Sequence, residues 1–204
     1  MLPAPAASDE AAVYLLAGRV GGWRGIFAHH SWIVLKEKGA DRYRRFDVVG
    51  WGSPLRRDGY DADGRWYGNT PEILGKLEGA AAERAIGPLL AAIDGYPHAG
   101  RGAYRIWPGP NSNSFVAEVV RAAPALAPAL LPTALGKDYR ADGRLLGLTP
   151  SGTGIQVTLM GVAGVSLGWV EGVEVNLFGL VAGADLRRPA LKLPGWGRIG
   201  LAPG

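Results

Sequence analysis

The chain has 204 residues, 48% of them hydrophobic and 20% charged, and a formal net charge of +4. This composition is typical of a globular protein with a substantial core, and we expect residues 1–204 to form a single domain. The absence of cysteine excludes disulfides, thiolate metal sites and a cysteine nucleophile. Scattered basic residues argue against a nucleic-acid partner. No cluster of His, Asp and Glu has the spacing of a zinc site, so we expect neither a metal nor a cofactor.

The first residues, MLPAPAASDEAA, have neither the basic nor the apolar region of a signal peptide. We therefore expect a soluble protein, located in the cytoplasm or associated with the cell envelope, and the sequence leaves these two compartments open.

Strands are predicted first along the chain. Residues 12–17 (AVYLLA) form a short, continuously apolar segment, and residues 21–28 read as a loop. Residues 30–36 (HSWIVLK) and 43–49 (YRRFDVV) predict a β-hairpin around a turn at 38–41.

Helices are predicted next. Thr70-Pro71-Glu72 has the sequence of a helix start, with a hydroxyl cap followed by proline and an acid. Residues 86–93 have helical spacing and end near Gly95, with Gly87-Pro88 as a potential interruption. After an extended segment at 104–107, another helix is expected from about Ser112 to just before Pro124.

The C-terminal third contains an uncharged stretch, residues 145–170, that is long enough to cross a membrane as a helix. Its pattern predicts strands instead, because apolar residues alternate with polar or small ones from Ile155 to Leu177, and period two indicates a strand with one buried face. We expect a β-meander over 145–186 and no membrane-spanning segment. The Gly/Pro-rich residues 190–204 are expected to wrap the surface as a tail. The predicted fold class is α+β, an antiparallel sheet with packed helices followed by the meander.

The string "WPGPNSNSF" (107–115) places four small polar residues where a helix begins. A side-chain oxygen of Asn111 to Ser114 can cap the free amides of the first turn, which is a general need of helices. The same position also suits a nucleophilic hydroxyl, because the free amides and the positive end of the helix can stabilise an oxyanion. The sequence leaves both interpretations open for Ser112.

A nucleophile would need a base, and His30 has the best surroundings of the three histidines. If Glu37 lies opposite Arg42 in the predicted hairpin, His30, Trp32 and Asp47 share one face, with Asp47 diagonal to His30. A carboxylate in that position would orient an imidazole base. Arg45 shares the same face and could simply pair with Asp47.

The order of these segments resembles the circularly permuted branch of the NlpC/P60, papain-like superfamily, which includes lecithin:retinol acyltransferase-like proteins. In that branch a strand-borne histidine comes first, and an "N-C-x-x-F-V" helix start bearing the nucleophilic cysteine follows. Here Asn111-Ser112-Asn113-Ser114-Phe115-Val116 places Ser112 where the cysteine would be. This resemblance covers 12–121 and implies a permuted papain-like core there. The strings "HSWIVLKEKGA", "GRWYGNTPEILG" and "WPGPNSNSF" are also similar to a bacterial family of unknown function, from Tyr14 to Gly200.

The resemblance implies a hydrolase or acyltransferase acting on an amide or ester, such as a cell-wall peptide or an acyl lipid. Ser112 would attack, His30 would act as base and Asp47 would orient it. The amides around Asn113 and Ser114 would stabilise the oxyanion, with Asn111 and Trp32 also in the cleft.

The alternative function is a non-catalytic ligand-binding or structural module on the same fold, because serine forms essentially no alkoxide in a site adapted to a thiol. Attachment to a membrane through the apolar meander is a third hypothesis. The sequence leaves the oligomeric state open.

Overall fold

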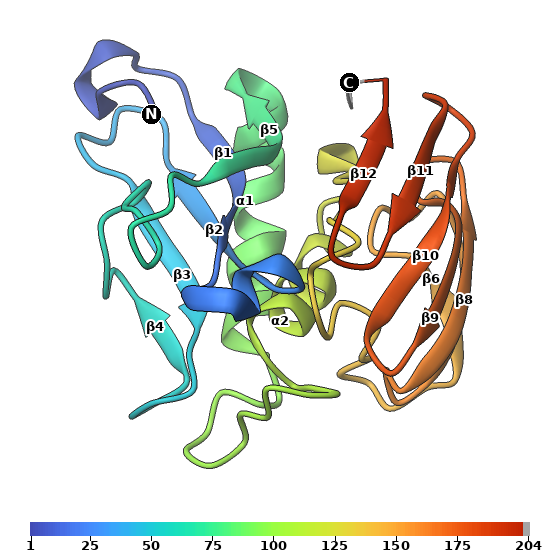
Figure 1. The fold of residues 1–204 in the computed structure, drawn as a ribbon. Helices are drawn as coiled ribbons and strands as arrows, with labels where there is room; N and C mark the ends of the chain where they lie inside the picture. The colour runs from blue at the N-terminus through green and yellow to red at the C-terminus, as the bar shows by residue number, and fades with distance from the viewer. Residues whose placement is uncertain (202–204) are drawn as a thin grey trace.

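A five-stranded antiparallel sheet occupies the N-terminal half of the protein (Figure 1). In the computed structural model, which describes residues 1–201, its strand order is β4-β3-β2-β1-β5. The strands are β1 (Ala12–Arg19), β2 (His29–Lys36), β3 (Arg44–Val48), β4 (Leu55–Arg57) and β5 (Glu72–Glu78). The predicted hairpin and its register are confirmed, since Ile33 pairs with Phe46 and Leu35 with Arg44.

The central strands β1 and β2 are buried on both faces, which explains why β1 is continuously apolar. Val13 and Leu15 belong to the core shared with the helices, and Tyr14 and Leu16 belong to a second cluster on the opposite face. Trp66, from the loop between β4 and β5, covers that second face.

Two α-helices cover one face of the sheet, α1 (Gly79–Asp94) and α2 (Ser112–Val120). α1 packs on β1 and β5, and α2 packs on β2 and β3. The predicted helix at 86–93 is confirmed as part of α1, which continues through Pro88. Three short 3-10 helices complete the helical content of residues 1–201: η1 (Pro5–Ala7), η2 (Gly22–Ile26) and η3 (Pro124–Leu126).

The helix start predicted at Thr70-Pro71-Glu72 is wrong. Glu72 begins strand β5, which pairs along the free edge of β1, with Ala17 opposite Glu72 and Ala12 opposite Glu78. An available sheet edge is a tertiary feature, and here it outweighs the local capping signal. The segment 104–107, expected to be extended, is not part of a strand, and its last two residues form bends.

The C-terminal third forms a seven-stranded antiparallel sheet in which each strand pairs with its sequence neighbours, so the β-meander is confirmed. Its strands are β6 (Leu146–Leu148), β7 (Gly154–Leu159), β8 (Ala163–Gly168), β9 (Gly172–Leu177), β10 (Leu180–Asp185), β11 (Ala190–Leu193) and β12 (Gly197–Gly200). The surface tail expected over 190–204 is therefore wrong, because β11 and β12 extend the sheet; residues 202–204 lie outside the described residues.

The larger sheet buries its polar face. Gln156, Ser166 and Glu174 are 1–3% exposed, whereas their neighbours Ile155 and Leu167 are more than half exposed. The connector between α2 and β6 lies under the polar face (Figure 1), where Gln156 Nε2 donates to Asp138 Oδ1 at 2.9 Å. The alternation thus predicted strands correctly, but the buried side is the polar one. Within residues 1–201, no helix has both the length and the apolar character needed to cross a membrane.

Candidate functional site

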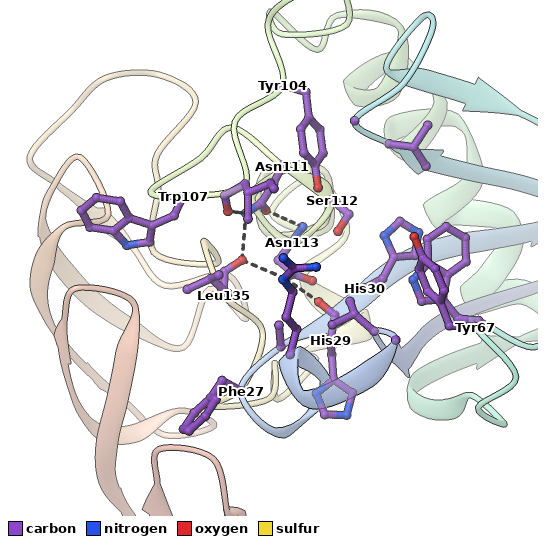
Figure 2. A pocket seen from close by; sticks show the side chains of 18 of the residues that line it. Phe27, His29, His30, Tyr67, Tyr104, Trp107, Asn111, Ser112, Asn113 and Leu135 are labelled. Atoms are coloured by element: carbon purple, nitrogen blue, oxygen red, sulfur yellow. Dashed lines mark hydrogen bonds between the residues drawn. The ribbon is translucent and has the colours of Figure 1, made fainter.

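A cleft of about 1230 Å³ opens where the start of β2 meets the start of α2. His29, His30, Ser112 and Asn113 lie in its wall, together with aromatic side chains from four loops. Figure 2 shows Ser112 and His30 entering the cleft from α2 and β2. Segments that are more than 80 residues apart in the sequence therefore meet at one site.

The start of α2 is fixed by a capping box. The Asn111 side chain accepts hydrogen bonds from the amides of Asn113 (2.9 Å) and Ser114 (3.1 Å). The Ser114 hydroxyl accepts from the Asn111 amide at 2.6 Å. Asn111 and Ser114 are therefore structural, as the capping interpretation predicts.

Asn113 connects the helix to the histidine strand. Its Nδ2 donates to the carbonyl of His29 and to that of Leu135, both at 2.8 Å (Figure 2). One amide group thus ties together β2, α2 and the connector. The Oδ1 atom of Asn113 is buried without a hydrogen-bond partner among the described residues.

His30 is held on both sides. Its Nε2 lies 3.2 Å from Asp47 Oδ2, and its ring stacks on Trp66 with centroids 3.8 Å apart and an interplanar angle of 11°. Arg45 donates to the same Asp47 oxygen, at 2.7 Å from Nη2. The predicted proximity of His30 and Asp47 is confirmed, and so is the pairing of Asp47 with Arg45.

The electrostatics favour a neutral imidazole beside an ionised carboxylate. Burial has the largest effect on His30 and, with the Arg45 charge, lowers its pKa below the usual 6.5, although Asp47 acts in the opposite direction. Burial would raise the pKa of Asp47, but the hydrogen bonds and charges of His30 and Arg45 outweigh it, and the pKa is lowered. At neutral pH, Nε2 therefore carries the proton donated to Asp47, and the lone pair lies on Nδ1.

Ser112 is the first residue of α2 and is 4% exposed. Among the described residues, neither its hydroxyl nor its amide has a hydrogen-bond partner, and the hydroxyl is not bonded to His30. Both groups are thus free to interact with a ligand in the cleft. Figure 2 shows the hydroxyl end of Tyr104 directed toward the same region.

Two predicted cleft residues lie elsewhere. Trp32 is fully buried behind His30, where its Nε1 donates to the carbonyl of Ala62 at 2.8 Å, and Ser114 is fully buried in the cap. The amides of Asn113 and Ser114, expected to stabilise an oxyanion, already donate to Asn111.

The sequence did not single out Tyr67, Tyr104 and Trp107 as wall residues of the cleft. Aromatic residues next to glycine, as in "RWYGN", were the available signal, but such residues more often anchor loops. His29 binds Thr133 through Nδ1 at 2.8 Å, and burial and the charge of Arg19 lower its pKa to about 4. It is therefore neutral at physiological pH.

No group of His, Cys, Asp and Glu in residues 1–201 could hold a metal ion. No curated protein and no solved structure matches the chain. None of these comparisons points to the NlpC/P60 superfamily. Residues 10–139 match the family described as "Protein of unknown function (DUF3750)". The match runs from β1 into the connector and includes every residue that lines the His30–Ser112 cleft. The chain belongs to this family.

Proposed function

We propose that the cleft is the site of a Ser/His-dependent hydrolase or acyltransferase acting on an amide or ester. The observation that carries the proposal is the orientation of the His30 ring, which leaves one nitrogen available as a base. Asp47 fixes its Nε2, its Nδ1 is unbonded among the described residues, and Ser112 faces the same cleft from the first turn of α2. An oriented base beside a hydroxyl at a helix N-terminus is the arrangement that activates a serine.

In this proposal Ser112 Oγ attacks the substrate carbonyl while His30 Nδ1 takes its proton. The imidazolium that forms is stabilised by Asp47 and later gives the proton to the leaving group, which departs as an amine or alcohol. Water or a second alcohol or amine then attacks the acyl-serine, with His30 again as base, and releases Ser112.

The oxyanion needs donors that the helix cap does not use. The free amide of Ser112 itself is one such donor. The Tyr104 hydroxyl is the second candidate, and since burial raises its pKa above the usual 10.0, it keeps its proton at neutral pH.

The permuted papain-like core over 12–121 is part of this proposal. Its support is the order of a strand-borne histidine followed by a helix that begins with Ser112. Aromatic walls and a volume of about 1230 Å³ suit an amphipathic acyl or peptidyl substrate, such as an acyl lipid or a cell-wall peptide.

An activity-based probe tests the proposal. A fluorophosphonate should label the protein at Ser112, as mapped by peptide mass spectrometry. Labelling should disappear in Ser112→Ala and fall roughly 100-fold or more in His30→Gln, because general-base catalysis contributes that much. The exposed Ser53 supplies a matched control, since Ser53→Ala should be labelled like the wild type.

The lack of cysteine allows a second, independent test. Ser112→Cys creates a single thiol, and the imidazole of His30 should make its alkylation by iodoacetamide faster than that of Ser53→Cys. The added change His30→Gln should remove the difference. If Ser112 is not labelled and the two thiols react equally fast, the catalytic proposal fails.

One observation favours a second candidate function, a ligand-binding module without turnover. The Ser112 hydroxyl is not hydrogen-bonded to His30 in this structure, so the geometry of an activated serine is not formed in the unliganded protein. A binding module predicts no labelling of Ser112 while Ser112→Ala still binds the same ligands.

A further inference from the structure

The outer face of the seven-stranded sheet is exposed and entirely apolar. A row of paired residues crosses all seven strands, each beside the next: Leu148, Ile155, Leu167, Val173, Ala184, Leu191 and Ile199. The adjacent row on the inner face is mainly polar and includes Gln156, Glu174 and Lys192. With strand spacings of about 4.8 Å and six residues in each of the central strands β7 to β10, the outer face is roughly 30 Å long across the strands and up to about 20 Å wide. That is at or above the largest apolar patch of a typical monomer, about 300–600 Å².

The turns at one end of the sheet extend this face. Met160 and Phe178 are the first residues of the β7–β8 and β9–β10 turns, with φ of 50° and 53°, and each is followed by a glycine with positive φ. Asparagine normally fills this position, because bulky side chains are disfavoured there. Phe178 is nevertheless 70% exposed, and Trp196 in the β11–β12 turn is 76% exposed. These turns keep large apolar side chains in an unfavourable backbone conformation without burying them.

Basic residues outnumber carboxylates in the larger sheet. From residue 143 to residue 201, the carboxylates are Glu171, Glu174 and Asp185, and all three are buried. Arg144 and Arg188 are exposed. The sheet therefore presents an aliphatic centre, aromatic turns and two exposed arginines, of which Arg144 lies 4.0 Å from the exposed Asp142 just before the sheet.

We infer that this face docks on an anionic lipid bilayer, with the aliphatic side chains and the turns entering the membrane interface. A second copy of the chain is the competing occupant, but protein interfaces concentrate aromatic residues at the centre and have a polar rim. Here the centre is aliphatic, and Phe178, Trp196 and Trp169 lie at the turns, which is the distribution of lipid-contacting surfaces. Residues 143–201 contain five basic residues and three carboxylates, and this positive net charge complements anionic headgroups.

Docking in this way would bring the cleft close to the membrane. The Phe178 ring lies 6.5 Å from that of Trp107, which is part of the cleft wall, and Gly195 in the last turn packs against Phe27, another wall residue. Substrates anchored in the bilayer could then reach Ser112 without leaving the surface. The docking itself does not depend on the proposed catalysis.

Vesicle co-sedimentation tests the inference. The wild-type protein should pellet with vesicles of phosphatidylglycerol and phosphatidylcholine in equal parts, and less with phosphatidylcholine alone. Leu167→Asp places a charge at the centre of the outer face, at a side chain that is 54% exposed, and should reduce the bound fraction roughly tenfold or more. Ile73→Asp is the matched control: Ile73 is a 42% exposed aliphatic residue on β5 of the other sheet, and its substitution should leave vesicle binding unchanged.

A labelled variant provides a readout that does not require a charge in the sheet. Leu167→Cys carrying an environment-sensitive fluorophore should shift to shorter wavelength with anionic vesicles, whereas Ser53→Cys with the same label should not. Ser112→Ala should bind vesicles like the wild type, which separates this inference from the proposed catalysis.

Three results would overturn the inference: no pelleting above the vesicle-free control, equal binding of Leu167→Asp and the wild type, or no fluorescence shift at position 167. A lipid-free dimer in sedimentation velocity that Leu167→Asp converts to a monomer, without vesicle binding by the wild type, would assign the face to a second copy.

Discussion

Asp47 serves His30 and Arg45 through one oxygen atom. Oδ2 lies 3.2 Å from His30 Nε2 and 2.7 Å from Arg45 Nη2, while Oδ1 is buried without a partner among the described residues. The Arg45 guanidinium also lies 4.1 Å from the centroid of the Trp32 ring and donates to the carbonyl of Asp61. The pairing with arginine is therefore compatible with orientation of the imidazole, and it helps to keep the carboxylate ionised.

Replacing Asp47 with asparagine should destabilise the protein by about 3 kcal/mol, because the 1% exposed Arg45 would lose its counter-ion. Urea unfolding followed by circular dichroism measures this loss. Asp94→Asn removes a partner from the exposed ion pair with Arg57 and should cost less than about 1 kcal/mol. Equal losses in the two variants would contradict the prediction.

At the scale of elements, different residues in the first turn of α2 cap the helix and face the cleft. Asn111 and Ser114 form the cap, whereas Ser112 between them leaves its hydroxyl to the cleft. The sequence left open whether the polar residues 111–114 cap the helix or serve the cleft. In the structure, Asn111 and Ser114 form the cap, and Ser112 faces the cleft.

Asn111→Ala should lower the free energy of unfolding by about 2 kcal/mol. The side-chain oxygen that accepts hydrogen bonds from two backbone amides of the first turn would be lost, and so would the hydrogen bonds from Asn111 Nδ2 to the carbonyls of Ile106 and Leu135. Ser112→Ala should cost less than about 0.5 kcal/mol, since its hydroxyl has no partner among the described residues. Chemical denaturation of both variants measures the difference. A larger loss in Ser112→Ala would show that this hydroxyl, too, is structural.

The sequence predicts most strands and the hairpin register because alternation and turn residues act locally. It fails at β5 and β11–β12, where the strand forms on an edge that another segment supplies. It also cannot tell which face of the larger sheet is buried, because alternation is the same for either choice and the polar connector under the sheet decides it.

The site was predictable to the same extent. His30 and Asp47 lie on one local hairpin, so their proximity follows from its register. Trp66 and Tyr104 come from irregular loops whose positions depend on the whole fold, and no periodic pattern in the sequence predicts where their side chains lie.

At the scale of the molecule, His29 joins the sheet to the connector. Its amide donates to the carbonyl of Thr133 at 3.0 Å, its Nδ1 lies 2.8 Å from Thr133 Oγ1, and its carbonyl accepts from Asn113. Opening of the connector would therefore disturb the cleft wall as well.

Global stability should fall in acid through this residue. The pKa of His29 is about 4 in the folded protein, against 6.5 for an ordinary histidine, so the unfolded chain binds more protons between these values. Stability is then fully present above pH 6.5 and falls as the pH drops toward 4, by up to about 3 kcal/mol.

The urea concentration at the unfolding midpoint, measured between pH 7 and pH 4.5, should fall as the pH falls. His29→Gln should make this decrease smaller. Because His30 acts in the same direction, part of the slope should remain. Parallel curves for the two proteins would assign the acid sensitivity to other groups.

The strand order of the larger sheet affects which part of the protein folds first. Every pairing there joins immediate neighbours, whereas β1 must find β5 some 60 residues further on. Local pairings form faster than distant ones. The meander should thus assemble early, hairpin by hairpin, and a refolding chain would expose the apolar outer face of the meander before the five-stranded sheet has closed.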